Sequence, residues 1–287
     1  MNDRPRLAAA AAALCRPVTP GRLSIFAVLC GLTLFTLYPL VWLVTNSFKT
    51  TNEMFDRSWS LPESWLYQNY LDAWNFGLGH YIVNSVFVTA ISVTAIVLVG
   101  ALNAFVLSVL EFRGKPLIYA FLLGGMIMPP EVCLFPLFKI LTTLGLYNTY
   151  FAMILPYVAF GLPFATFLIR AHMATIPIEL YEAAVVDGAG VLRIFWLIYL
   201  PLSRPALAAA GLIMVMRVWN EFIFALTFVQ SDSLRTLTIG ISTFGDALRV
   251  DWTVLMAGLV ISVIPVLFVF LAMQRQFISG LTQGAVK

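Results

Sequence analysis

Long stretches without a charged residue constrain this chain more than any other feature. Each of four such windows exceeds the ~20 residues that a helix needs to cross ~30 Å of hydrocarbon; they cover residues 23–48, 73–110, 140–169 and 252–274. Two further apolar stretches are interrupted only by Glu131 and by Arg217 and Glu221. Together they predict six membrane-spanning helices, at 23–45, 82–110, 117–139, 150–169, 205–229 and 252–273.

The composition agrees with a helical membrane protein. Hydrophobic residues make up 61% of the chain and charged residues 11%, against about 45–50% and about 25% in soluble domains. The net charge of +3 is too small to indicate nucleic-acid binding. The two histidines, His80 and His172, are far apart and the three cysteines are scattered. The residues therefore predict neither a metal site nor a catalytic centre.

The distribution of Lys and Arg predicts the orientation, because these residues favour the cytoplasmic side of membrane proteins. With the N-terminus inside, eleven lie inside and five outside: Arg4, Arg6, Arg16, Arg22, Arg113, Lys115, Arg170, Arg193, Arg204, Arg275 and Lys287 against Lys49, Arg57, Lys139, Arg235 and Arg249. We therefore expect both termini to be cytoplasmic. Residues 1–22 are predicted to form a basic cytoplasmic tail, 23–273 the membrane domain, and 274–287 a cytoplasmic C-terminal tail.

The connections between spans contain two segments of interest. The outer connection, residues 46–80, includes a stretch at 61–75 that predicts a short amphipathic helix. The longest inner connection, residues 170–204, predicts a second short helix after Pro177, with Ile178, Tyr181 and Val185 on one apolar face and a break at Gly188. Periodicity alone leaves two alternatives for this face: it packs against the chain's own helix bundle, or it docks in a groove of another protein.

The inner connection also carries a spaced motif. Glu182-Ala183-Ala184, Gly188, Ile198 and Leu200-Pro201 follow the pattern EAA-x3-G-x9-I-x-LP, and Asp187 and Ala189 extend it. The segment resembles the EAA loop of ABC-importer permeases. Similarity continues through Trp219-Asn220-Glu221-Phe222, Arg235-Thr236-Leu237 and the terminus from Gln274 to Lys287. From about Leu23 onward, the chain is similar to the second, six-span permease of maltose-type carbohydrate importers.

This resemblance implies an all-α integral membrane protein with the type I ABC importer permease core. It implies that Glu182, Ala183, Ala184, Asp187, Gly188 and Ala189 form a coupling helix in a cleft of an ATP-hydrolysing subunit. The implied partners are a second permease that completes a heterodimeric pore, two ATP-binding subunits that use ATP and Mg, an extracytoplasmic solute-binding protein and the membrane lipid. The implied location is a bacterial or archaeal plasma membrane. The chain has no GxxxxGK[ST] phosphate loop, so we expect it to be no enzyme.

Charges and prolines within the spans are the remaining candidates. Arg217 and Glu221 are four residues apart and are predicted to share one helix face. With Trp219 and Asn220 they are expected either to line the translocation path or to contact the partner permease. Pro129, Pro130 and Glu131 interrupt the third span, because each proline removes a backbone donor. That interruption predicts either a cavity wall or a helix end with Glu131 in water.

The substrate stays open at this level. The resemblance implies a sugar, and a polyol or a glycerol-3-phosphate-type ester is the alternative with the same architecture. A stand-alone secondary transporter is a more distant alternative. It would require inverted repeats and an intramembrane ion relay, and the sequence shows neither a repeat nor more than one pair of charges at that depth.

Overall fold

The computed structural model describes residues 20–247 and 251–283. Most of the predicted basic N-terminal tail, and residues 284–287 of the C-terminal tail, lie outside the described residues. Within the described ranges all regular elements are helices. The chain divides after Leu66 into two compact units, residues 1–66 and 67–287.

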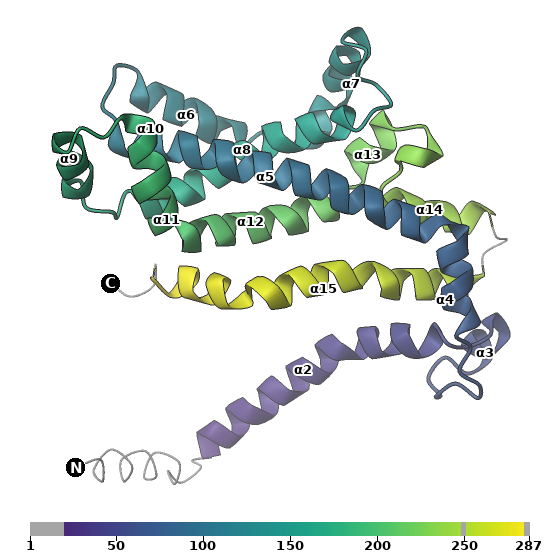
Figure 1. The fold of residues 1–287 in the computed structure, drawn as a ribbon. Coiled ribbons are helices and arrows are strands. Elements are labelled where there is room, and N and C mark those ends of the chain that lie inside the picture. The colour runs from purple at the N-terminus through teal and green to yellow at the C-terminus, as the bar shows by residue number, and fades with distance from the viewer. Residues whose placement is uncertain (1–19, 248–250, 284–287) are drawn as a thin grey trace. The chain divides into compact units, whose positions relative to one another are not determined.

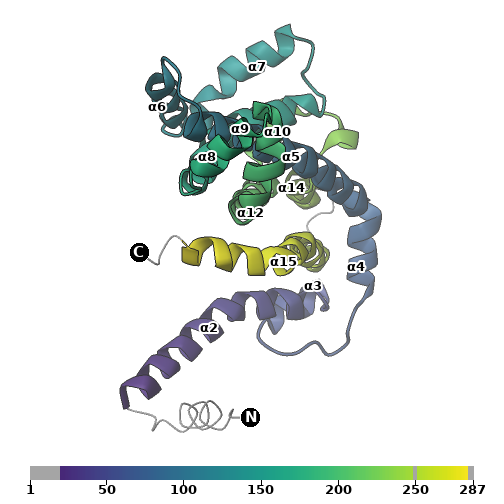
Figure 2. The same ribbon diagram turned by 60° about the vertical axis from the view of Figure 1, so that its left-hand side comes forward.

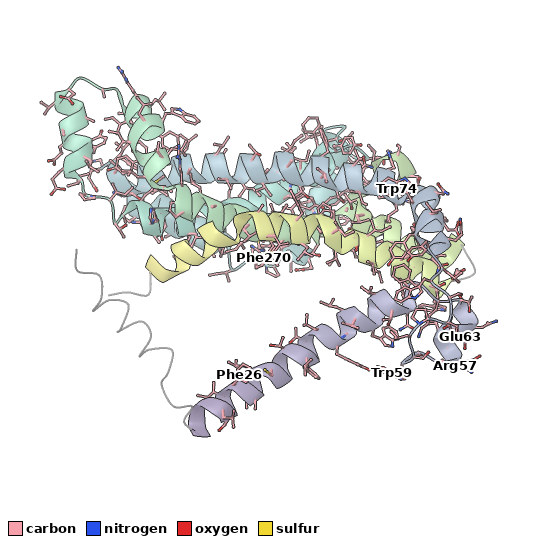
Figure 3. All side chains as sticks on the ribbon, turned by 60° about the horizontal axis from the view of Figure 1, so that its bottom comes forward. Phe26, Arg57, Trp59, Glu63, Trp74 and Phe270 are labelled. Atoms are coloured by element: carbon pink, nitrogen blue, oxygen red, sulfur yellow. The ribbon has the colours of Figure 1, made fainter. Side chains whose placement is uncertain are left out.

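The first unit contains the predicted first span. Helix α2 (Pro20–Asn46) is apolar around its whole circumference, and most of its side chains are exposed within this unit. A helix that is hydrophobic on every face requires a membrane or a protein around it. In Figure 3, Phe26 lies on the N-terminal half of α2, and Arg57, Trp59 and Glu63 gather beyond its C-terminal end.

A buried lysine shapes the segment that follows α2. Lys49 is fully buried beside α3 (Thr51–Asp56), and its Nζ donates to the carbonyl oxygens of Arg57 at 2.8 Å and Ser58 at 3.3 Å. Burial lowers the pKa of Lys49, while the carboxylate of Glu53 acts in the opposite direction. These bonds turn the chain back at the end of α3.

The second unit begins with a helix that differs from the predicted one. Residues 61–67 are not helical, so the prediction of a helix over 61–75 is wrong for its first half. Instead the amide of Leu66 donates to the carbonyl of Phe48 at 2.9 Å, within the first unit. Helix α4 (Gln68–Ala73) continues as a π-helical turn, η1 (Trp74–Leu78), and then as α5 (Gly79–Val109). This run is kinked at Gly77, whose φ of 113° suits glycine.

Four helices form the body of the second unit: α5, α8 (Phe151–Met173), α12 (Arg204–Trp219) and α15 (Trp252–Gln283). They run side by side in Figures 1 and 2. The contact between α5 and α8 is the most extensive. It depends on small residues: Gly100 lies against Ala165, and a methyl group at Gly161 would lie 2.6 Å from Cδ1 of Ile96. Small residues permit such close approach of helices in membranes.

Two of the predicted spans are broken. Helix α6 (Lys115–Gly125) is followed by η2 (Pro130–Cys133) and α7 (Leu134–Thr143) at an angle of 93°, so the break predicted at Pro129–Pro130 is confirmed. The predicted fifth span, 205–229, ends early, because α12 stops at Trp219 and a separate α13 (Ile223–Phe228) follows.

Helix lengths and composition give a range for the number of spans. Four described helices are long and apolar enough to cross a membrane, and the number rises to six if each bent pair is one span. The second bent pair joins residues 191–202 to α12 at 77° and comprises α10 (Val191–Ile194), η3 (Phe195–Tyr199) and α11 (Leu200–Leu202) before the bend.

The shorter helices occupy the two ends of the second unit. Helix α9 (Glu179–Val186) lies with α10 and α11 at one end. Helices α7, α13 and α14 (Leu237–Ala247) lie at the other end (Figure 1), where η4 (Asp232–Leu234) precedes α14. The EAA segment and the connection around residues 230–237 are therefore at opposite ends of this unit.

Candidate coupling and translocation sites

The EAA residues form a short helix with a well-defined end. Acidic residues Glu179 and Glu182 occupy the first turn of α9, where they suit the helix dipole. At the other end the amide of Ala189 donates to the carbonyl of Ala184 at 2.9 Å, and that of Gly188 donates to Val185 at 3.0 Å. This pair of bonds is a Schellman motif. Gly188 has φ of 77°, so the predicted break at this glycine is confirmed.

Most of α9 is uncovered within this chain. Ala184 is buried against the bundle, and Tyr181 is half-buried. By contrast, Val186 is 87% exposed, and Glu182, Ala183 and Asp187 are exposed as well. The helix is therefore attached to its bundle through one side and presents apolar and acidic groups on the others.

A cavity of about 180 Å³ lies at the other functional region, between α8, α12, α13 and η2. Four of the candidate residues line it: Pro130, Glu131, Arg217 and Glu221. Sequence reasoning missed the rest of the wall, formed by Tyr157, Phe160, Gly161, Met214, Val218, Ile223 and Phe224. The Pro156-Tyr157 step and Gly161 interrupt an otherwise apolar window, which was the available signal.

Glu221 lies outside the helix on which it was predicted. Helix α12 ends at Trp219, so the expectation that Glu221 shares a helix face with Arg217 is wrong. Its carboxylate accepts hydrogen bonds from the amides of Phe224 at 2.8 Å and Ala225 at 3.2 Å, and from the hydroxyl of Tyr157 at 2.5 Å. Its carbonyl accepts from the hydroxyl of Thr238 at 2.8 Å. These bonds supply the compensation that a charge at membrane depth requires.

The remaining candidates separate into two places. Pro129 and Arg217 line a neighbouring hollow, and Arg217 carries its guanidinium 5.9 Å from the ring centre of Phe164. Trp219 is 7% exposed and packs in an apolar cluster with residues of α14 and α15. Asn220 is exposed, but its side-chain amide donates to the carbonyl of Met216. Trp219 and Asn220 line a different hollow, of about 420 Å³, beside α14 and α15.

Asn148 fastens the connection that follows α13, and sequence reasoning did not single it out. Its Oδ1 accepts from the amides of Gln230 and Ser231, both at 2.9 Å, and its Nδ2 donates to the Ser231 hydroxyl at 2.7 Å. Its own amide donates to the carbonyl of Phe228 at 3.0 Å. Asn148 has φ of 56°, a conformation that asparagine tolerates better than most residues.

A second asparagine holds the next part of the same connection. Nδ2 of Asn84, on α5, donates to the carbonyls of Ser233 at 3.0 Å and Arg235 at 2.9 Å. Its Oδ1 accepts from the hydroxyl of Tyr150 at 2.8 Å. The hydroxyl of Tyr81 donates to Asp232 at 2.9 Å. Residues 228–235 are thus bound to both α5 and the segment before α8.

Metal chemistry finds no support in the described residues, in which no group of three or more His, Cys, Asp and Glu is placed to hold an ion. The two sites instead consist of an exposed helix and a small charged cavity.

Comparison with known proteins agrees with these features. Residues 96–283 match the family described as "Binding-protein-dependent transport system inner membrane component". The probable ABC transporter permease protein YurM of Bacillus subtilis is 43% identical over 267 residues, which cover 93% of this chain and 89% of the relative. The diacetylchitobiose uptake system permease protein NgcG of Streptomyces coelicolor is 35% identical over 258 residues, covering 89% of this chain and 85% of the relative.

A solved structure extends the similarity to three dimensions. A chain of a bacterial ABC transporter involved in the import of the acidic polysaccharide alginate superposes with a TM-score of 0.77 at 25% identity, covering 88% of this chain and 95% of that chain. Family members are membrane components of transport systems rather than enzymes. This chain belongs to the family of binding-protein-dependent inner membrane transport components, as a multi-pass permease subunit of a carbohydrate ABC importer.

Proposed function

We propose that this chain forms half of the translocation pore of an ATP-driven sugar importer, with a second permease as the other half. The observation that carries the proposal is the EAA helix α9, which is closed by Gly188 and uncovered on most of its surface. Exposed valines on a helix outside the membrane are stabilised when the helix packs into a groove of another protein.

The cover we propose for α9 is the groove of an ATP-binding subunit. Two such subunits bind ATP and Mg, and this chain contributes Glu182, Ala183, Ala184, Asp187, Gly188 and Ala189 to the contact. Ala183 is exposed and small enough for close packing, and Glu182 presents a carboxylate for a basic residue of the groove. The C-terminal tail, residues 274–287, reaches the same interface.

The opposite end of the unit receives the solute-binding protein. Residues 230–251 provide the contact, and the clamps at Asn148 and Asn84 hold its first part in place. Both termini are then cytoplasmic. Because the two docking regions lie at opposite ends of the unit, the membrane helices between them have to transmit movement from one region to the other. Such movement would open the path to one side of the membrane at a time, which is alternating access.

The translocation path runs beside the broken helices. Helices broken at membrane depth normally line protein or water rather than lipid. We propose that Pro129, Pro130, Glu131, Arg217 and Glu221 border the path. Trp219 and Asn220 lie beside α14 and α15, where they support the path or the contact with the second permease.

Val186 provides the sharpest test of the coupling proposal. Its side chain is 87% exposed, so Val186→Glu leaves the packing of this chain intact but buries a charge in the proposed groove. We expect loss of uptake and of co-purification of the ATP-binding subunits from membranes of cells that express the whole transporter. Val186→Thr keeps the shape and serves as the control. Uptake and co-purification that survive Val186→Glu would refute the docking of α9.

A further inference from the structure

Two charged side chains of the cavity have their hydrogen-bonding groups open. Neither the guanidinium of Arg217 nor the carboxylate of Glu131 forms a hydrogen bond or an ion pair with any residue of the described ranges 20–247 and 251–283. They line the same cavity from α12 and η2 and do not approach each other within the 4.0 Å of an ion pair. A guanidinium and a carboxylate at membrane depth are costly unless something polar meets them.

The third charge of the cavity is already occupied. Both carboxylate oxygens of Glu221 accept bonds, from Phe224 on one side and from Ala225 and Tyr157 on the other. The groups available to a ligand are therefore five N–H donors of Arg217 and the acceptor oxygens of Glu131. With Glu221 included, the cavity carries one positive and two negative charges, so a free phosphate or carboxylate meets no net attraction.

The rest of the wall is largely apolar and includes three aromatic rings. Phe160 and Phe224 line the cavity, with ring centres 5.6 Å apart, and Tyr157 lies beside Phe224. Binding sites for small molecules combine such apolar walls with a few convergent polar groups. A pyranose ring has the matching pattern, since its C–H faces are apolar and its rim carries adjacent hydroxyls. The volume of about 180 Å³ suits one ring rather than an oligosaccharide.

We infer that this cavity binds a single uncharged sugar ring, with Arg217 donating and Glu131 accepting hydrogen bonds at adjacent hydroxyl groups. The inference rests on the proposed function and adds the chemical class of the passenger at this subunit. It assigns a direct substrate contact to this chain and excludes phosphorylated and uronic-acid passengers from the cavity.

Protection of an introduced cysteine tests the inference on the complete transporter in detergent. Cys15, Cys30 and Cys133 are first replaced by Ser. Ile223 lines the cavity and is 40% exposed, whereas Leu226 is 52% exposed on the same helix and does not line it. Maleimide labelling of Ile223→Cys and of the control Leu226→Cys is measured with maltose or diacetylchitobiose, and separately with glycerol 3-phosphate or an alginate disaccharide.

We expect the neutral sugars to slow labelling of Ile223→Cys and to leave Leu226→Cys unchanged. Arg217→Gln and Glu131→Gln should each raise the half-protecting concentration by about tenfold or more, because each removes a charge-assisted bond. Equal slowing at both positions, no slowing, equal protection by the anions, or protection unaffected by the substitutions would each overturn the inference.

Two readouts separate this inference from its premise and from misfolding. Uptake of the sugar by the unsubstituted complex without any protection of Ile223→Cys overturns the subsite alone, whereas absence of ATP-dependent uptake overturns the proposed function. Assembly is followed by co-purification of the other subunits. If Arg217→Gln disrupts assembly, Arg217→Lys is used in its place. Arg217→Lys and Glu131→Asp both keep the charge but alter the geometry of the hydrogen bonds. Protection equal to that of the wild type in both variants would count against the inference.

Discussion

At the residue scale, the carboxylate of Glu221 joins segments that are distant in the sequence: α8 through Tyr157, and the first turn of α13 through Phe224 and Ala225. The sequence predicts that a charge among apolar residues requires compensation. It does not predict the partner, because that depends on where α12 ends. Because α12 ends at Trp219, Glu221 does not pair with Arg217 on one helix but links α8 to α13.

Substitution of Glu221 is expected to destabilise the protein in graded steps. Glu221→Ala leaves two amides and one hydroxyl without an acceptor, and each such loss costs about 1–3 kcal/mol. Glu221→Gln keeps one carbonyl acceptor, and Tyr157→Phe removes a single bond at about 1 kcal/mol. The melting temperature of the purified complex should therefore fall most for Glu221→Ala. Glu111→Gln is the control and should have little effect, because the Glu111 side chain is 86% exposed. An unchanged melting temperature for Glu221→Ala would contradict this role.

Gly188 gives the second prediction at this scale. A methyl group there meets nothing within 4 Å, so the whole cost of Gly188→Ala comes from its φ of 77°, about 1–2 kcal/mol. We expect the end of α9 to loosen and uptake to decrease while the chain remains folded. Gly190→Ala is the matched control, because Gly190 also has free space but an ordinary φ of −69°. Equal uptake rates for the two variants would count against this explanation.

At the element scale, the helix breaks differ in how far the sequence reveals them. The Pro129–Pro130 pair predicts the break between α6 and α7, because two consecutive backbone N–H donors are missing. The break at residues 220–222 contains neither proline nor glycine. There the carboxylate of Glu221 captures the amides that begin α13, and the carbonyl of Glu221 is held by Thr238. Tertiary hydrogen bonds of this kind leave no trace in local periodicity.

Asn148 supplies the prediction for a single element, the connection after α13. Asn148→Ala removes the bonds to the amides of Gln230 and Ser231 and to the Ser231 hydroxyl. At about 1 kcal/mol for each bond, hydrogen exchange at these two amides should accelerate by about tenfold or more. Asn148→Asp keeps the accepting oxygen and tolerates the same backbone conformation, so its effect should be smaller. Exchange rates that do not distinguish the two variants would show that another contact holds the connection.

At the scale of the whole molecule, composition and charge placement predict a multi-pass membrane protein, and the spaced EAA residues predict its family. The family match over residues 96–283 confirms that prediction. The cavity was less accessible from sequence, because its wall comes from η2, α8, α12 and α13. The clearest signals were Pro130, Glu131, Arg217 and Glu221, as interruptions of apolar stretches, and the Pro156-Tyr157 step and Gly161 were weaker ones. The aromatic residues between them look like ordinary parts of a membrane helix.

Orientation across the membrane gives the prediction at this scale. Val186 in α9 and Ser233 in η4 are both exposed, and η4 directly precedes α14, at the end of the second unit opposite to α9. In intact cells, a membrane-impermeant maleimide should label Ser233→Cys in a chain without other cysteines. Val186→Cys should react only after the membrane is opened, because the positive-inside distribution predicts a cytoplasmic α9. Labelling in the reverse order would invert the assigned topology.

The close packing of α5 on α8 has a mechanical consequence. At Gly161 and Gly100 the two helices are in such close contact that even an added methyl group would crowd its neighbours. Closely packed interfaces switch between discrete arrangements rather than deform gradually. Ala184 of α9 belongs to the same buried cluster as this pair. If α9 receives a force in the proposed docking, the α5–α8 pair moves as a rigid unit. Bending then has to occur where the helices are broken, at Gly77 and at Pro129–Pro130. A substitution that stiffened either break would leave the packing of α5 on α8 unchanged but remove a point at which the helices can bend.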